Sequence, residues 1–147
     1  MQFIQRIGGA WQLDDYLRHL DDHASQFPPG AREFATAEWH YDIREKQCPH
    51  DSWLEEFSIK VAPSGDRSEI RSTQIFSKYL GSYHDGYHSI AYDDVVSYVA
   101  DLSETGGDWI VDEITVDAVG MVRHEILLAE GLMIIRCKDL HYSWTPR

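Results

Sequence analysis

The spacing of apolar residues changes once along this chain of 147 residues, and that change sets the fold class. Near the N-terminus, apolar residues recur every three or four positions, which is the period of an amphipathic α-helix. These residues are Leu13, Tyr16, Leu17, Leu20, Ala24 and Phe27. Asp14 and Asp15 fall in the first turn, where acids favour the helix dipole, and 28–30 (Pro-Pro-Gly) ends the helix. A single short turn is expected at 31–34.

From about residue 53 the apolar residues alternate with period two, as they do in β-strands. Clusters of Gly, Pro and Asp at 63–66, 106–107, 119–120 and 130–131 separate the segments. The expected strands are 53–61, 69–80, 109–116, 121–128 and 132–137, the last continuing to 144, with a weaker strand at 34–43.

This order of elements predicts a single α+β domain, 1–147, with an N-terminal helix packed on a curved, mainly antiparallel sheet. The sheet is expected to end in a C-terminal β-meander. A partly open barrel is the alternative form of the same sheet.

Composition and charge narrow the function classes. The net charge is −12 and the sequence pI is near 4.9, which disfavours nucleic acids and anionic membrane surfaces as partners. No segment approaches the ~18 consecutive apolar residues of a membrane span, and residues 1–11 lack the apolar core of a secretory signal. We therefore expect a cytoplasmic protein in which Cys48 and Cys137 are reduced, buried thiols.

Acidic residues are concentrated in segment 79–122, which is called the acidic middle below. It contains no Lys or Arg, and five of the eight tyrosines lie between positions 79 and 98. Without basic neighbours in the sequence, its carboxylates are expected to be solvated, to bind a cation or to meet a basic partner. The nine acids are Asp85, Asp93, Asp94, Asp101, Glu104, Asp108, Asp112, Glu113 and Asp117.

The dipeptide at 85–86 (Asp-Gly) predicts a two-residue type I′ hairpin turn within the acidic middle. In that register His84 pairs with Tyr87, Tyr83 with His88, and Tyr79 with Tyr92. Side-chain alternation then places Tyr79, Tyr83, His88 and Tyr92 on one face of the hairpin.

Two interpretations of this hairpin stay open. It is either an aromatic binding surface with a pH-sensitive histidine, or an ordinary sheet with one core face and one solvated face. A helix at 92–99, whose apolar spacing also fits a helical stripe, would shorten the hairpin. The candidate partner- or ligand-binding residues are Tyr83, His84, Asp85, Tyr87, His88, Asp93, Asp94 and Asp112.

Three local groups contain residue types that bind metals, but the sequence predicts neither a metal nor another cofactor. They are 48–51 (Cys-Pro-His-Asp), the pair His84 and His88, and the alternating Cys137, Asp139 and His141. Only the histidine pair has a zinc-like spacing, and the expected hairpin would point its members to opposite faces.

The chain also lacks the motifs of common catalytic sites. No nucleophile elbow, phosphate loop or dinucleotide fingerprint occurs. The adjacent acids at 55–56 and 112–113 would face opposite ways on strands, so no catalytic residue is assigned.

The leading hypothesis is a non-enzymatic interaction protein that engages a basic protein partner through the acidic, Tyr-rich middle. Its specific form is an immunity-type or inhibitor protein that neutralises a basic toxin or nuclease, since electrostatic steering speeds such capture. The alternative is a small-molecule-binding or hydrolytic domain with a His and carboxylate pocket between helix and sheet. A homo-oligomer formed through an exposed sheet edge is the third hypothesis.

Overall fold

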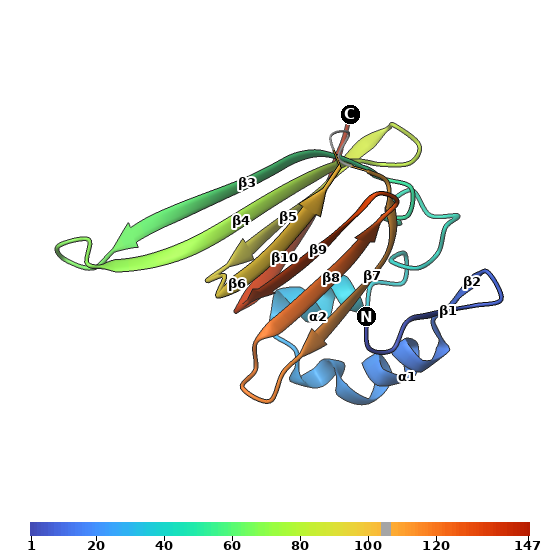
Figure 1. The fold of residues 1–147 in the computed structure, drawn as a ribbon, viewed down its shortest axis with the longest axis horizontal. Helices are drawn as coiled ribbons and strands as arrows, with labels where there is room; N and C mark the ends of the chain where they lie inside the picture. The colour runs from blue at the N-terminus through green and yellow to red at the C-terminus, as the bar shows by residue number, and fades with distance from the viewer. Residues whose placement is uncertain (104–106) are drawn as a thin grey trace.

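A computed structural model describes residues 1–103 and 107–147, and these residues form mostly antiparallel sheets with two α-helices (Figure 1). The elements fit the α+β class that the sequence predicts. In chain order they are β1 (Gln5–Ile7), β2 (Ala10–Gln12), α1 (Asp14–His23), η1 (Ala24–Gln26), α2 (Pro29–Ala35), β3 (Trp53–Ser64), β4 (Ile70–Leu80), β5 (Gly86–Asp93), β6 (Ser97–Leu102), β7 (Trp109–Val116), β8 (Val122–Leu128), β9 (Gly131–Cys137) and β10 (Asp139–Pro146).

Two four-stranded sheets meet at a bend, where two strands of the first sheet are joined by short segments to two strands of the second. The first sheet has the order β10-β5-β4-β3, and the second has the order β6-β9-β8-β7. β5 leads into β6 and β9 leads into β10, while β10 pairs with β5 and β6 pairs with β9. At the bend the Lys138 N–H donates to the Asp93 carbonyl, and the Val96 N–H donates to the Arg136 carbonyl.

The outer strands of the two sheets meet at their first residues. Trp53 forms an isolated bridge with Asp108, and the Trp109 N–H donates to the Ser52 carbonyl at 2.8 Å. The described strands do not form a closed barrel. Figure 1 shows the β3–β4 ribbon extending away from the other strands.

The N-terminal helical region is divided into three short pieces. α1 ends at His23, a 3-10 turn follows, and Pro28 precedes α2, whose first residue is Pro29. The turn expected at 31–34 is therefore part of a seven-residue helix. Proline suits this first position because its missing N–H has no intrahelical partner there.

α2 lies very close to β10. The Asp139 carboxylate accepts hydrogen bonds from the Gly30 and Ala31 N–H groups at the start of the helix. A Cβ on Gly30 would lie 1.9 Å from the Leu140 carbonyl oxygen, so only glycine allows this approach. The contact fixes α2 against the C-terminal strand.

α1 contacts the second sheet through a buried tyrosine. The Tyr16 hydroxyl donates to the Ile114 carbonyl at 2.9 Å and accepts the Ile114 N–H at 2.8 Å. Since Tyr16 is fully buried, this pair satisfies polar groups that water cannot reach.

Most strands expected from the sequence are present. β7 has the expected bounds, and β8 and β9 differ from them by one residue. The continuation toward position 144 is a separate strand, β10, which belongs to the other sheet.

One strand expected from the sequence is absent, and one helix that stayed open as an alternative does not form. Segment 34–43 is not a strand. Phe34 belongs to α2, and most of the residues that follow the helix form turns. Segment 92–99 is not a helix, because Tyr92 pairs in β5 and Ser97 begins β6. In both cases long-range packing overrides a local pattern.

The β4–β5 hairpin also differs from the expected register. Tyr79 pairs with His88 instead of Tyr92, which leaves 81–85 as a five-residue loop. The positive φ in this loop belongs to His84, at 57°, and not to Gly86. Gly86 is required for another reason, since a Cβ there would lie 2.1 Å from the Trp144 ring.

Candidate functional site

The predicted binding residues at the hairpin turn lie near one another, but only some of them are exposed. Tyr83 is 54% exposed, and the His84 ring lies edge-on to Trp53. The Asp85 carboxylate accepts a hydrogen bond from the Lys46 ammonium at 2.6 Å. The Lys78 ammonium lies 3.7 Å from the centre of the Tyr87 ring, which is a cation–π contact.

Asp93 and Asp94 lie at the other end of β5 from this turn. Seven steps of about 3.3 Å separate Asp93 from Gly86, so roughly 23 Å divides the two groups. Asp93 contacts the His141 ring nitrogen at 3.1 Å, and Asp94 lies 3.9 Å from the Lys138 ammonium. The predicted residues therefore do not form one site.

Several carboxylates of the acidic middle have basic partners from elsewhere in the chain, which corrects the expectation drawn from the local sequence. Arg136 forms an ion pair with Asp117, as Lys46 does with Asp85. Glu113 is buried and accepts the N–H groups of three consecutive residues, Gln2, Phe3 and Ile4. Glu104 lies outside the described residues.

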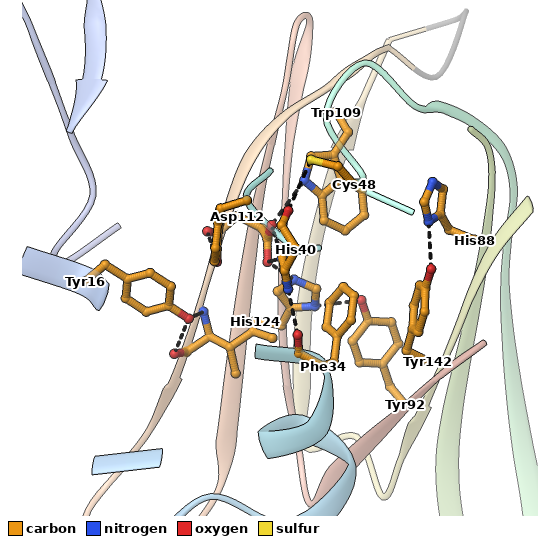
Figure 2. A network of polar contacts seen from close by, with 12 residues as sticks. Tyr16, Phe34, His40, Cys48, His88, Tyr92, Trp109, Asp112, His124 and Tyr142 are labelled. Atoms are coloured by element: carbon orange, nitrogen blue, oxygen red, sulfur yellow. Dashed lines mark hydrogen bonds and ion pairs between the residues drawn. The ribbon is translucent and has the colours of Figure 1, made fainter. Parts of the chain in front are cut away.

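Asp112 is the centre of a buried polar network (Figure 2). Its carboxylate contacts the Nε2 atoms of His40 and His124 at 2.9 and 3.0 Å. The Trp109 indole N–H also donates to it, at 3.2 Å. The side chains of Asp112 and both histidines are at most 1% exposed. The network joins loop 36–52 to β7 and β8.

The hydrogen-bond partners define where the protons of this network lie. His40 Nδ1 is 2.7 Å from the Phe34 carbonyl oxygen, which only accepts, so His40 carries a proton on Nδ1. An ionised carboxylate also only accepts, so His40 Nε2 donates to Asp112. His124 meets the Tyr92 hydroxyl at Nδ1, so a neutral ring satisfies both of its contacts.

The pKa directions agree with this assignment. Burial opposes the charge of Asp112, but the His40 charge and the hydrogen bonds from His124 and His40 outweigh it. Together they hold the Asp112 pKa well below its ordinary value. Burial lowers the pKa of His124, and its contacts with Asp112 offset only part of that effect.

This arrangement does not supply a general base. Both nitrogens of His40 and both nitrogens of His124 are engaged by groups of the chain itself. The Cys48 thiol donates to the His40 carbonyl, and burial raises its pKa to about 11. A thiol that stays protonated is a poor nucleophile. The network therefore has the properties of a structural connection.

The network holds loop 36–52, which separates α2 from β3 and contains 17 residues. From within the loop, His40 and Cys48 are buried, and the Tyr41 hydroxyl donates to the Asp112 carbonyl at 3.1 Å. Loops of this length without secondary structure are uncommon and are usually functional or disordered. This loop is fixed from inside, so it presents a defined surface.

Three cavities border the loop: a groove of about 490 Å³ whose lining includes Leu17, Thr36 and Glu38, and two smaller ones. One, of about 190 Å³, is mainly apolar; its lining includes Trp11, Leu13, Ile43, Cys48, His40 and Asp112. The other, of about 320 Å³, is lined by aromatic and polar residues that include Phe34, Trp39, Tyr142, Trp144, Glu33 and Gln47.

The structure gives no support for a metal centre among residues 1–103 and 107–147. No group of three or more His, Cys, Asp or Glu residues there is arranged to hold a metal ion. None of the helices in those two ranges is long and apolar enough to cross a membrane. Comparisons with protein-family models, curated proteins and solved structures find no match for the chain.

Sequence reasoning singled out Asp112 but not its partners. His40 is 72 positions away, and its segment was expected to be a strand. His124 was expected only as an ordinary strand residue, and Cys48 as a reduced, buried thiol with no link to Asp112. No local motif connects these residues, because the network forms only when the loop folds onto the second sheet.

Proposed function

We propose that this chain is a non-enzymatic interaction protein that binds a basic protein partner through the surface of loop 36–52. The observation that carries the proposal is the loop itself, which is long, irregular and anchored by buried residues at positions 40 and 48. Preorganisation of this kind reduces the entropy lost on binding. The proposed interface is therefore loop 36–52 and not the acidic middle.

The charges of the loop support a basic partner. Glu38 and Glu45 are exposed and form no ion pair within the described residues. The basic residues of the loop are already engaged, since Arg44 is held by Asp42 and Lys46 by Asp85. The loop therefore offers unpaired carboxylates and few free cations, which favours steering of a positively charged protein.

The apolar cavity beside the loop supports a contact with a protein. At about 190 Å³ it is smaller than the ~300–1,000 Å³ typical of pockets for drug-sized ligands. It has the size for one apolar side chain, which is how the central residues of many interfaces are buried. An immunity-type or inhibitor protein remains the specific form of this proposal.

A small apolar ligand is the second candidate occupant, because His40 and Asp112 form part of the wall of the same cavity. An engineered cavity of ~150 Å³ binds benzene, so the volume suffices for a monocyclic molecule. The hydrolytic form of this alternative is not supported, since neither imidazole of the network has a free nitrogen.

We also propose that the N-terminal helix packs on a curved, partly open sheet and that the protein is cytoplasmic. The Tyr16 contacts with Ile114 support an N-terminal helix packed on the sheet. The meeting of β3 and β7 at Trp53 and Asp108 supports a curved, partly open arrangement.

A charge-reversal pair tests the proposed function. The double variant Glu38→Lys/Glu45→Lys is compared with Glu56→Lys/Asp66→Lys, which changes the net charge equally on the exposed β3–β4 ribbon. Candidate basic proteins, beginning with the product of the neighbouring reading frame, are tested for binding by surface plasmon resonance at two salt concentrations.

We expect the loop variant to lower the association rate of the partner about tenfold or more at low salt, and the ribbon variant to leave it nearly unchanged. Equal effects of the two variants would contradict a loop interface. Binding of benzene or toluene to the wild-type chain, measured by calorimetry, would favour the small-ligand alternative.

A further inference from the structure

The second cavity beside loop 36–52 has a chemical character of its own. It measures about 320 Å³, and its lining includes four aromatic residues and one acid: Phe34, Trp39, Tyr142, Trp144 and Glu33. Glu33 is exposed and forms no ion pair within the described residues. We call this cavity the aromatic pocket.

Close packing of α2 on β10 brings the rings of the pocket together. The Phe34 ring stacks on Tyr142 with the ring centres 4.8 Å apart, and Trp39 lies 4.7 Å from Tyr142. Trp144 occupies the space left by Gly81 and Gly86, where a Cβ would meet its ring at 2.9 and 2.1 Å. These contacts fix the aromatic walls.

The surroundings of the pocket favour a cation. None of the residues that line it is Lys or Arg. His141 also lines it, with a ring nitrogen 3.1 Å from the Asp93 carboxylate. Beneath Tyr142 and Trp144 lies His88, whose Nδ1 contacts the Tyr142 hydroxyl. Burial and then the charge of His40 lower the His88 pKa to about 4, so this ring is neutral at physiological pH.

We propose that the aromatic pocket binds the guanidinium group of an arginine side chain from the basic partner. This inference rests on the proposed function and names the chemistry of one contact. Aromatic faces attract cations, and a planar guanidinium both stacks on rings and forms paired hydrogen bonds with a carboxylate such as Glu33. Lysine presents a compact, strongly hydrated ammonium that gains less from this geometry.

Short peptides test the proposal without knowledge of the partner. The probe is acetyl-Gly-Arg-Gly-amide, and its controls replace arginine with uncharged citrulline or with lysine. The chain is labelled with ¹⁵N at its five tryptophans, and the indole N–H signals are followed by NMR during titration. Trp53, which is 48% exposed and outside the pocket, reports non-specific binding.

We expect the arginine peptide to shift the Trp39 and Trp144 signals saturably and to leave Trp53 nearly unchanged. Citrulline and lysine peptides should bind at least about threefold more weakly, from the strength of cation–π and exposed ion-pair contacts. Glu33→Gln should weaken arginine binding by a similar factor, whereas Glu56→Gln, at an exposed acid of β3 that does not line the pocket, should not.

Absence of a saturable shift, equal binding of citrulline or lysine, or a parallel shift of Trp53 would overturn the assignment. So would an unchanged affinity in Glu33→Gln. Failure of the arginine assignment can be distinguished from failure of the proposed function. A partner whose association depends on Glu38 and Glu45 but not on Glu33 supports the loop interface and excludes the arginine contact.

Discussion

His88 should make the stability of the fold depend on pH. The residue is 1% exposed, and its Nε2 atom has no hydrogen-bond partner among the described residues. Burial, followed by the charge of His40, lowers its pKa from 6.5 to about 4. Its neutral form therefore suits the folded state, while the unfolded chain takes up a proton as the pH falls below 6.5.

The magnitude follows from the two pKa values of this group. Because the folded pKa is lowered, the stability due to neutral His88 is present above pH 6.5 and is lost as the pH falls toward 4. A difference of about 2.5 between the folded and unfolded pKa corresponds to about 3.4 kcal/mol in total. About 2 kcal/mol of that is lost between pH 7 and pH 5.

Urea unfolding at several pH values between 7 and 4.5 measures this effect. His88→Phe removes the titrating group, and His88→Gln does so while keeping a polar partner for the Tyr142 hydroxyl. Both variants should lose about 2 kcal/mol less than the wild type between pH 7 and pH 5. His50→Gln, at a site 41% exposed, serves as the control. Parallel pH profiles for the wild type and both His88 variants would refute the reasoning.

Three further perturbations address the buried network, the packing of the C-terminal strand and the thiols. Asp112→Ala should lower the free energy of unfolding, measured in urea, by about 3–5 kcal/mol. The reason is that the N–H donors of two histidines and a tryptophan lose their acceptor. A loss under about 1 kcal/mol would contradict the network. Gly86→Ala should cost about 1–3 kcal/mol in the same assay and change the fluorescence of Trp144, since the new methyl group overlaps its ring; an unchanged midpoint and spectrum would be inconsistent with this packing. Burial raises the pKa of Cys48 to about 11 and that of Cys137 to about 12, so both thiols should react slowly with Ellman's reagent at pH 8 and quickly in urea; rapid reaction of the native protein would argue against burial.

The strands of the second sheet were predictable because two local signals agree there. β7, β8 and β9 consist of β-prone residues, and turn residues such as Gly120 separate them. The segment that ends the helical region was harder to predict. Phe34 was expected in a strand, although it packs as part of α2 once Gly30 allows the helix to approach β10.

The register expected for the β4–β5 hairpin is wrong, but the faces expected for most of its side chains are correct. The observed pairing of Tyr79 with His88 differs from the expected pairing by four residues, which is an even number. Because side chains alternate with period two, Tyr79, His88 and Tyr92 still share one face, and all three are buried there. Tyr83 was misplaced because it lies in the loop. The close approach of Trp144 to Gly86 has no local sequence signal.

The adjacent acids of β7 show that the net charge of a segment does not measure the charge that it exposes. Asp112 and Glu113 face opposite sides of the strand, as alternation predicts, yet both are buried. Each is stabilised by donors from distant segments: Asp112 by His40 and His124, and Glu113 by the backbone of residues 2–4. A buried carboxylate with this many donors organises the fold and contributes little to the surface. The charge available to a partner is therefore the part left exposed and unpaired, which on loop 36–52 includes Glu38 and Glu45. Burial of Asp112 removes one charge from the surface of the acidic middle, and the same residue holds loop 36–52 in place. For both reasons the proposed binding surface lies on the loop and not on the acidic middle.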